Sequence, residues 1–135
     1  MNIIHKAAGI IIKDRKLLLF KGGGKDTFVA PGGKPEGNET IKEALARELR
    51  EEIGIIINKD KLKEFGTFSA EAATKPGYIV NMEIFIVKSW KGEIKACEDG
   101  SEVLWVTSNL PDNVKIGSIF GHEVTPGLKE RDLID

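Results

Sequence analysis

The chain has 135 residues, of which 41% are hydrophobic and 30% are charged, a composition that excludes an intrinsically disordered or a membrane-embedded protein. Twenty basic residues stand against 21 acidic ones, and the resulting net charge of −1 gives no excess of positive charge for binding nucleic acid. This length predicts one domain, residues 1–135, with a core of its own.

The N-terminal segment predicts a β-hairpin. Two apolar runs, residues 4–12 and 17–21, flank a polar turn at Asp14 and Arg15. The apolar run at 7–12 is too short for a membrane span or a secretory signal. Cys97 is the only cysteine, which rules out an internal disulfide and is consistent with a reducing compartment. We therefore expect a cytoplasmic protein without membrane attachment.

Glycine is concentrated between the hairpin and the next expected helix. Residues 22–24 are all glycine and predict a flexible loop, of the kind that often lies beside a ligand site. Residues 27–30 predict a short strand, and a glycine turn follows at Pro31, Gly32 and Gly33. Backbone without side chains can approach a ligand closely, so Gly32 and Gly33 are candidate substrate-binding positions.

Local signals predict a helix that begins near Thr40 or Ile41 and ends at Gly54. Thr40 and Glu43 have the spacing of a capping box, and glycine favours the left-handed conformation that ends a helix. Apolar residues recur four positions apart and define the face that packs on the domain; they are Ile41, Leu45, Leu49 and Ile53.

Three carboxylates lie along the edge of that apolar face. At about 100° per residue, Glu48, Glu51 and Glu52 share one arc of the helix. Like charges at these spacings repel, and the neighbouring Arg47 can orient them but cannot neutralise all three. A hard divalent cation such as Mg²⁺ would do so, since it prefers oxygen ligands and is completed by substrate phosphates. The common alternative is a solvated charged face.

The remaining chain predicts further strands and a second helix. Residues 65–70 and 78–87 are apolar or aromatic runs separated by a turn at 75–77, and residues 103–106 predict another strand. The segment 98–102 before that strand is acidic and offers Glu98 and Glu102 as outside ligands or bases. A C-terminal helix is expected to begin after Thr125 and Pro126 and to run towards Asp132.

The segment from Gly33 to Ile55 resembles the signature box of the Nudix hydrolases, with every fixed position occupied. The pattern is Gly33, five residues, Glu39, seven residues, then Arg47-Glu48-Leu49-x-Glu51-Glu52-x-Gly54-Ile55. Nine specified positions make a chance match far less probable than for a short glycine motif. One departure is that many members have glycine directly before the first glutamate, where this chain has Asn38 with Gly37 one position earlier.

The resemblance implies an α/β fold, with a mixed central sheet between helices in an α/β/α sandwich. It also implies an enzyme that hydrolyses a nucleoside diphosphate linked to another group and uses Mg²⁺, with Mn²⁺ as the alternative. Glu48, Glu51 and Glu52 match the metal-binding glutamates, and the carbonyl of Gly33 matches a backbone ligand. Arg47 matches the arginine that orients a glutamate, while Glu39 matches a structural position. The general base is either a box glutamate or an acidic residue from another loop.

The substrate is less well specified by the sequence. Lys21, at the end of the second expected strand, is a candidate for binding substrate phosphates, and Lys25 is a weaker one. Several aromatic residues could stack on a base, although most aromatic residues in strands belong to the core; they are Phe28, Phe68, Tyr78, Phe85, Trp90 and Trp105.

The small size favours a MutT-like nucleoside triphosphate pyrophosphohydrolase acting on oxidised purine nucleotides. The alternatives are an ADP-ribose or nucleotide-sugar pyrophosphatase, an RNA-cap hydrolase and a non-catalytic nucleotide sensor. A degenerate sensor should have lost glutamates from the box, and none is missing. The expected partner is a small-molecule nucleotide, and the chain is expected to be a monomer or a homodimer.

Overall fold

The computed structural model describes residues 2–72 and 75–135, so Met1 and residues 73–74 of the predicted domain lie outside the described part. The largest sheet has the strand order β5-β1-β7-β6. It joins β5 (Gly32–Gly33), β1 (Asn2–Ile10), β7 (Tyr78–Ile86) and β6 (Lys63–Glu71). Strand β1 is parallel to β7 and antiparallel to β5. The sheet is therefore mixed, as predicted.

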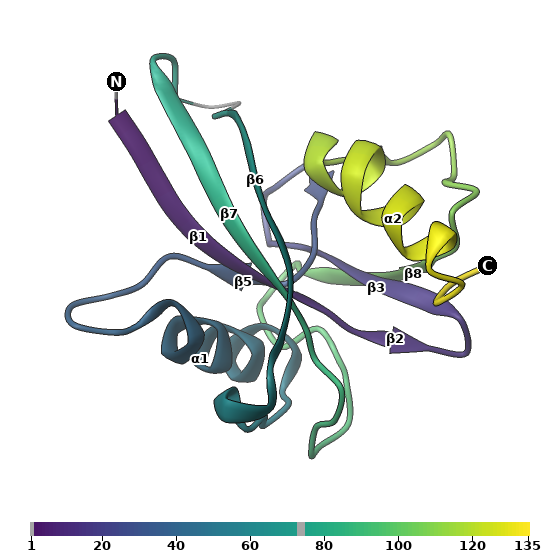
Figure 1. Ribbon diagram of the computed structural model, residues 1–135, viewed down its shortest axis with the longest axis horizontal. Coiled ribbons are helices and arrows are strands. Elements are labelled where there is room, and N and C mark those ends of the chain that lie inside the picture. The colour runs from purple at the N-terminus through teal and green to yellow at the C-terminus, as the bar shows by residue number, and fades with distance from the viewer. Residues whose placement is uncertain (1, 73–74) are drawn as a thin grey trace.

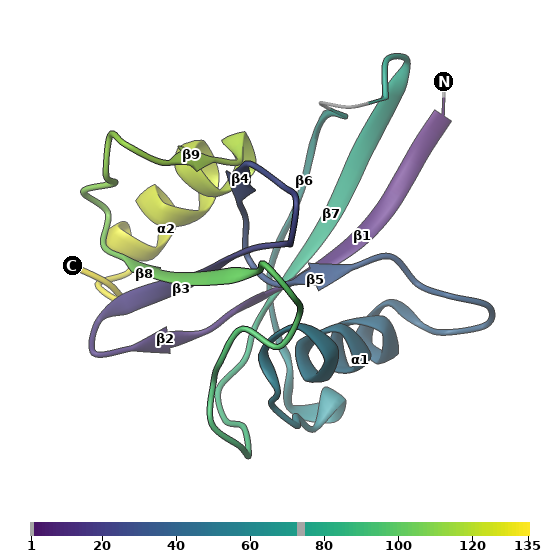
Figure 2. The ribbon, with the colours of Figure 1, turned by 180° about the vertical axis from the view of Figure 1, so that it is seen from behind.

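Two smaller sheets complete the strand arrangement (Figures 1 and 2). One contains β2 (Ile12–Lys13), β3 (Lys16–Lys21) and β8 (Glu102–Val106), and the other pairs β4 (Thr27–Phe28) with β9 (Lys115–Ile116). The predicted N-terminal hairpin is confirmed, since β2 and β3 pair antiparallel. Its turn residues Asp14 and Arg15 have φ of 52° and 60°, the left-handed conformation that suits a tight hairpin.

Two helical segments cover opposite sides of the strands (Figure 1). Helix α1 (Ile41–Ile53) packs its Leu45, Leu49 and Ile53 into one core cluster, and α2 (Thr125–Glu130) contributes Leu128 to the other. Strand β3 supplies both clusters, with Leu17 and Leu19 facing the α2 side and Leu18 and Phe20 facing the α1 side. This alternation follows from the two-residue period of a strand, and it gives the expected architecture of strands between helices.

The ends of α1 are fixed by the predicted caps. The Thr40 side chain accepts a hydrogen bond from Glu43 N–H at 3.1 Å, and the Glu43 carboxylate accepts one from Thr40 N–H at 2.9 Å. Gly54 ends the helix with φ of 74°. Local contacts at Thr40, Glu43 and Gly54 thus set where the helix that carries the acidic residues begins and ends.

Two strands differ from the sequence-based expectations. Gly32 and Gly33 form a two-residue strand instead of a turn, because they pair with Ala8 and Ala7 of β1. Strand β4 ends at Phe28, short of the expected residue 30.

The C-terminal helix is preceded by a π-helical turn (Phe120–Val124), so Pro126 lies within a longer helical segment. Thr125 N–H donates to the Phe120 carbonyl, and proline, which lacks a donor, follows at the next position. A short 3-10 helix (Lys59–Lys61) connects α1 to β6. None of the helices in the described ranges has the length and apolarity to cross a bilayer.

Candidate active site

Arg47 joins the loop after β5 to the acidic face of α1. Its Nε and Nη2 donate to the two Glu39 carboxylate oxygens at 2.8 and 3.0 Å, and its Nη1 donates to Glu48 at 2.7 Å and to Glu51 at 3.3 Å. Nη2 also donates to the Lys34 carbonyl at 3.1 Å. Hydrogen bonds to Glu39 and Glu48 hold the pKa of Arg47 above its ordinary value. The guanidinium therefore fixes the positions of several carboxylates at once.

Glu52 is the most deeply placed of the three helix carboxylates. Its Oε1 accepts a hydrogen bond from Gly32 N–H at 2.9 Å, and the side chain is partly buried. Burial raises the pKa of Glu52 to about 8, the Gly32 hydrogen bond opposes this rise, and the charges of Glu48, Glu98 and Glu51 add to it. In the metal-free protein this environment therefore favours the protonated form of the Glu52 carboxyl group.

Glu48 lies against the backbone of Gly33. A Cβ atom at Gly33 would lie 2.7 Å from the Glu48 Cδ, a distance that real Cβ atoms do not tolerate. Burial raises the pKa of Glu48, and the hydrogen bond from Arg47 opposes this rise only in part. Glycine at this position therefore leaves room for the Glu48 carboxylate beside the Gly33 backbone.

The donor chemistry of this cluster fits a hard divalent cation. Glu48, Glu51 and Glu52 supply only oxygen atoms, and two of them have a pKa raised by burial, so a cation would stabilise their ionised forms. Within residues 2–72 and 75–135, His, Cys, Asp and Glu side chains form no preassembled metal-ligating group of three or more. In the present arrangement Arg47 holds Glu48 and Glu51, while Gly32 holds Glu52.

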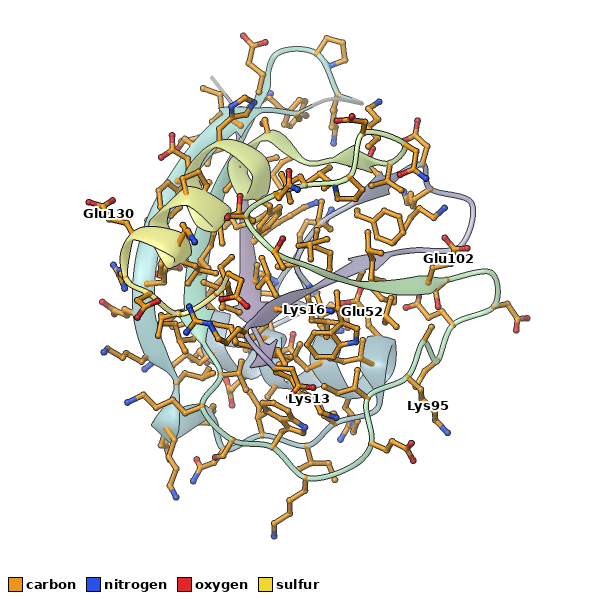
Figure 3. The ribbon with its side chains drawn as sticks, turned by 90° about the vertical axis from the view of Figure 1, so that its right-hand side faces the viewer. Lys13, Lys16, Glu52, Lys95, Glu102 and Glu130 are labelled. Carbon is orange, nitrogen blue, oxygen red and sulfur yellow. The ribbon has the colours of Figure 1, made fainter. Side chains whose placement is uncertain are left out.

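Of the predicted residues outside the helix, Lys21 and Glu102 pair with each other, while Glu98 lies near Glu52. Lys21 and Glu102 are register partners on β3 and β8, and their side chains form an ion pair at 2.9 Å. The Lys21 ammonium also lies 5.2 Å from the Phe28 ring centroid. Glu102 lies at the start of β8, away from Glu52 in Figure 3. Glu98, in the preceding loop, is close enough to Glu52 to raise its pKa.

Lys6 also lies near this cluster, although it is not among the residues predicted from the sequence. Burial lowers the pKa of Lys6, the charges of Lys34 and Lys25 lower it further, and those of Glu52 and Glu48 oppose the change. Lys6 therefore lies within electrostatic range of the box carboxylates. The only signal in the sequence is a lysine inside an otherwise mostly apolar strand.

A family model described as the NUDIX domain matches residues 3–118, which is most of the chain. The chain belongs to the Nudix hydrolase family. It is an enzyme that acts on phosphoric anhydride bonds, and Nudix hydrolases generally use divalent metal ions.

Curated relatives of this Nudix hydrolase have different activities in their names, and two of the relatives illustrate this. The chain is 37% identical over 107 residues to an ADP-ribose pyrophosphatase of Methanocaldococcus jannaschii, an alignment covering 76% of this chain and 62% of that protein. It is also 37% identical over 116 residues to an 8-oxo-dGTP diphosphatase of Haemophilus influenzae, covering 82% of this chain and 81% of that protein. The family and the reaction class are thus established, while the names do not agree on a substrate.

Solved structures support the Nudix fold. A MutT NUDIX hydrolase from Burkholderia pseudomallei superposes with a TM-score of 0.73 and 19% identity, covering 96% of this chain and 98% of that one. At this identity the likeness shows the fold alone. The predicted α/β class is confirmed.

Proposed function

We propose that this Nudix hydrolase is a nucleoside triphosphate pyrophosphohydrolase that releases a nucleoside monophosphate and pyrophosphate, with oxidised purine nucleotides among its substrates. The extent of the matches favours this substrate class. The alignment spans 81% of the H. influenzae 8-oxo-dGTP diphosphatase but only 62% of the M. jannaschii ADP-ribose pyrophosphatase.

The observation that carries the hydrolytic assignment is the cluster of Glu48, Glu51 and Glu52 beside Gly32 and Gly33. We propose that these three carboxylates and the Gly33 carbonyl hold Mg²⁺ or Mn²⁺, with Glu98 as an additional ligand, since Glu98 acts on Glu52 whereas Glu102 pairs with Lys21. When bound, such a cation neutralises phosphate charge and lowers the pKa of a water molecule. Mg²⁺ suits a site that is completed by substrate phosphates.

The protein residues position the reacting groups. Arg47 holds Glu48 and Glu51 in position through its hydrogen bonds, and the Gly32 N–H fixes one oxygen of Glu52. Water attacks one of the two phosphorus atoms that flank the bridging oxygen, and the bond from that phosphorus to the bridging oxygen breaks. A carboxylate accepts the proton that the water loses.

A second candidate function is hydrolysis of ADP-ribose or a nucleotide sugar. The 37% identity to the ADP-ribose pyrophosphatase favours it, and the same carboxylate cluster would perform the same bond cleavage. A nucleotide sensor is less well supported, because the box retains each of its glutamates.

A hydrolysis screen with Mg²⁺ tests the proposal. Its substrates are nucleoside triphosphates, 8-oxo-dGTP, ADP-ribose, nucleotide sugars and dinucleoside polyphosphates, and its products are identified by chromatography. Pyrophosphate and a monophosphate from a triphosphate would support the proposal. Cleavage of ADP-ribose or a nucleotide sugar alone would replace it with the second candidate, and nucleotide binding without any cleavage would favour the sensor.

A further inference from the structure

Lys6 lies in a row of side chains that crosses the largest sheet. In the register, Phe68 of β6 is opposite Met82 of β7, and Met82 is opposite Lys6 of β1. Side chains at paired positions lie on the same face of a sheet. The pairing of Ala7 with Gly33 places Lys34 next to Lys6 beyond the sheet edge. The row therefore contains Phe68 at one end and the two lysines, Lys6 and Lys34, at the end next to the Nudix box.

The face that carries this row is the α2 side of the sheet. The next row inward contains Ala8 and Ile84, which are each 1% exposed and belong to the core cluster that includes Leu128 of α2. Phe68 and Met82 are only partly buried at the border of that cluster. The row is thus the first one outside the core, where an apolar surface meets solvent.

Phe68 lies close against the sheet. A Cβ atom at Gly66 would be 3.0 Å from the Phe68 ring, so glycine provides the space in which the ring approaches its own strand. The ring centroid is 6.1 Å from that of Phe65, with the planes inclined at 38°. Phe68 and Met82 together supply an aromatic and a thioether side chain in the same row as Lys6.

The environment of Lys6 is unfavourable for a positive charge in the isolated protein. The side chain is half-buried, and none of the ion pairs found among residues 2–72 and 75–135 includes it. Burial and the charges of Lys34 and Lys25 lower the pKa of Lys6. An anion bound between these lysines would offset both the desolvation of Lys6 and the repulsion between the lysines.

Resting on the function proposed above, we propose that Lys6 is a substrate-binding residue that binds the substrate phosphate next to the nucleoside. The nucleoside lies over Phe68 and Met82, and the remaining phosphates extend towards Glu48 and Glu52. This assignment explains why the positively charged Lys6 lies between the apolar side chains of Phe68 and Met82 and the acidic cluster on α1. Lys21 is less suited to the role, because Glu102 already pairs with its ammonium at 2.9 Å.

Binding measurements on Lys6→Met and Lys6→Arg test this role. The probes are GMP and AMP, with guanosine and adenosine as their phosphate-free counterparts, titrated calorimetrically with EDTA present so that metal binding does not contribute. Lys6→Met should weaken binding of the monophosphates about 10- to 100-fold, the range for a charged hydrogen bond, and leave nucleoside binding unchanged. Lys6→Arg should retain most of the affinity.

Kinetics with the best substrate of the wild-type enzyme provide a second readout. Lys6→Met should raise KM about 10- to 100-fold, while kcat changes by less than about threefold. Lys63→Met is the matched control, since Lys63 is an exposed lysine of the same sheet, paired with Ile86 at its other end. The control should leave binding and kinetics unchanged. Melting curves should show Lys6→Met at least as stable as the wild type, because the variant removes a half-buried charge.

Several outcomes would overturn the role of Lys6. They are unchanged monophosphate affinity in Lys6→Met, an equal loss for nucleosides and monophosphates, or no detectable monophosphate binding by the wild type. A wild-type protein that binds GMP or AMP through Lys6 but hydrolyses none of the substrates in the screen would contradict the proposed function and leave this inference intact.

Discussion

Arg47 is the residue on which the geometry of the acidic face most depends. It is 15% exposed and contacts Glu39, Glu48 and Glu51 together with the Lys34 carbonyl. Arg47→Ala should lower kcat/KM about 10- to 100-fold, the usual effect of removing a residue that orients metal ligands, and should also lower Tm. Arg50→Ala, at an exposed position of the same helix, is the control. Unchanged rate and Tm in Arg47→Ala would contradict an organising role.

Glu52 gives the metal-free protein a distinctive dependence on pH. Burial raises the pKa of Glu52 from an ordinary value of 4.5 to about 8 in the folded protein. Between these values the folded state binds more protons than the unfolded state, so the free energy of unfolding contributed by Glu52 falls as pH rises. With EDTA present, Tm should therefore decline from about pH 5 to about pH 8 more steeply in the wild type than in Glu52→Gln.

The comparison of the two proteins removes the contributions of groups that titrate alike in both. Glu48, whose pKa is also raised, remains in both. Parallel pH profiles for wild type and Glu52→Gln would show that Glu52 is ionised in the folded protein without a cation.

At the scale of elements, the junction between β5 and α1 determines how closely the carboxylates approach the backbone. A Cβ at Gly33 would lie 2.7 Å from the Glu48 Cδ, whereas nothing lies within 4 Å of a Cβ at Gly37. Gly33→Ala should reduce kcat/KM about tenfold or more by displacing Glu48.

Gly37→Ala is the matched control for this prediction. Gly37 has φ of 55°, so alanine there should cost about 1 kcal/mol of stability through backbone strain and leave kcat unchanged. Steady-state kinetics and urea denaturation separate the two effects. Equal activity in the two variants would refute the importance of the close approach at Gly33.

The elements that sequence predicts well are those with local signals. Helix α1 follows from its capping box, its apolar spacing and Gly54, all within one segment. The two-residue strands β5 and β9 carry no such pattern. They exist because Gly32 and Gly33 meet β1, and because Lys115 and Ile116 meet β4, which are contacts between segments distant in sequence.

The same distinction applies to the candidate site. The acidic arc of Glu48, Glu51 and Glu52 is readable from helix periodicity, and Arg47 from its place beside it. The position of Lys6 depends on the strand order β5-β1-β7-β6, which a single sequence does not specify. Likewise, the pairing of Lys21 with Glu102 depends on the register between β3 and β8.

At the scale of the whole molecule, the mixed sheet connects two functions of the proposed site. Its β5 edge holds the backbone against α1, where the carboxylates gather, and its α2 side carries the apolar row next to Lys6. At the β5 edge of the sheet, the α1 side thus carries the hydrolytic carboxylates and the α2 side carries the proposed surface for the nucleoside. This arrangement follows from β1, which pairs with both β5 and β7 at the centre of the sheet.

The central claim is that the α1 carboxylates hold the metal for pyrophosphate-bond hydrolysis, and turnover of Glu51→Gln and Glu52→Gln with Mg²⁺ tests it most directly. Each change removes a charge but almost no volume, so both variants should fold as the wild type does by circular dichroism. Each should lose at least about a hundredfold in kcat, while the exposed control Glu64→Gln keeps normal turnover. Near-normal kcat in both folded variants would contradict the assignment.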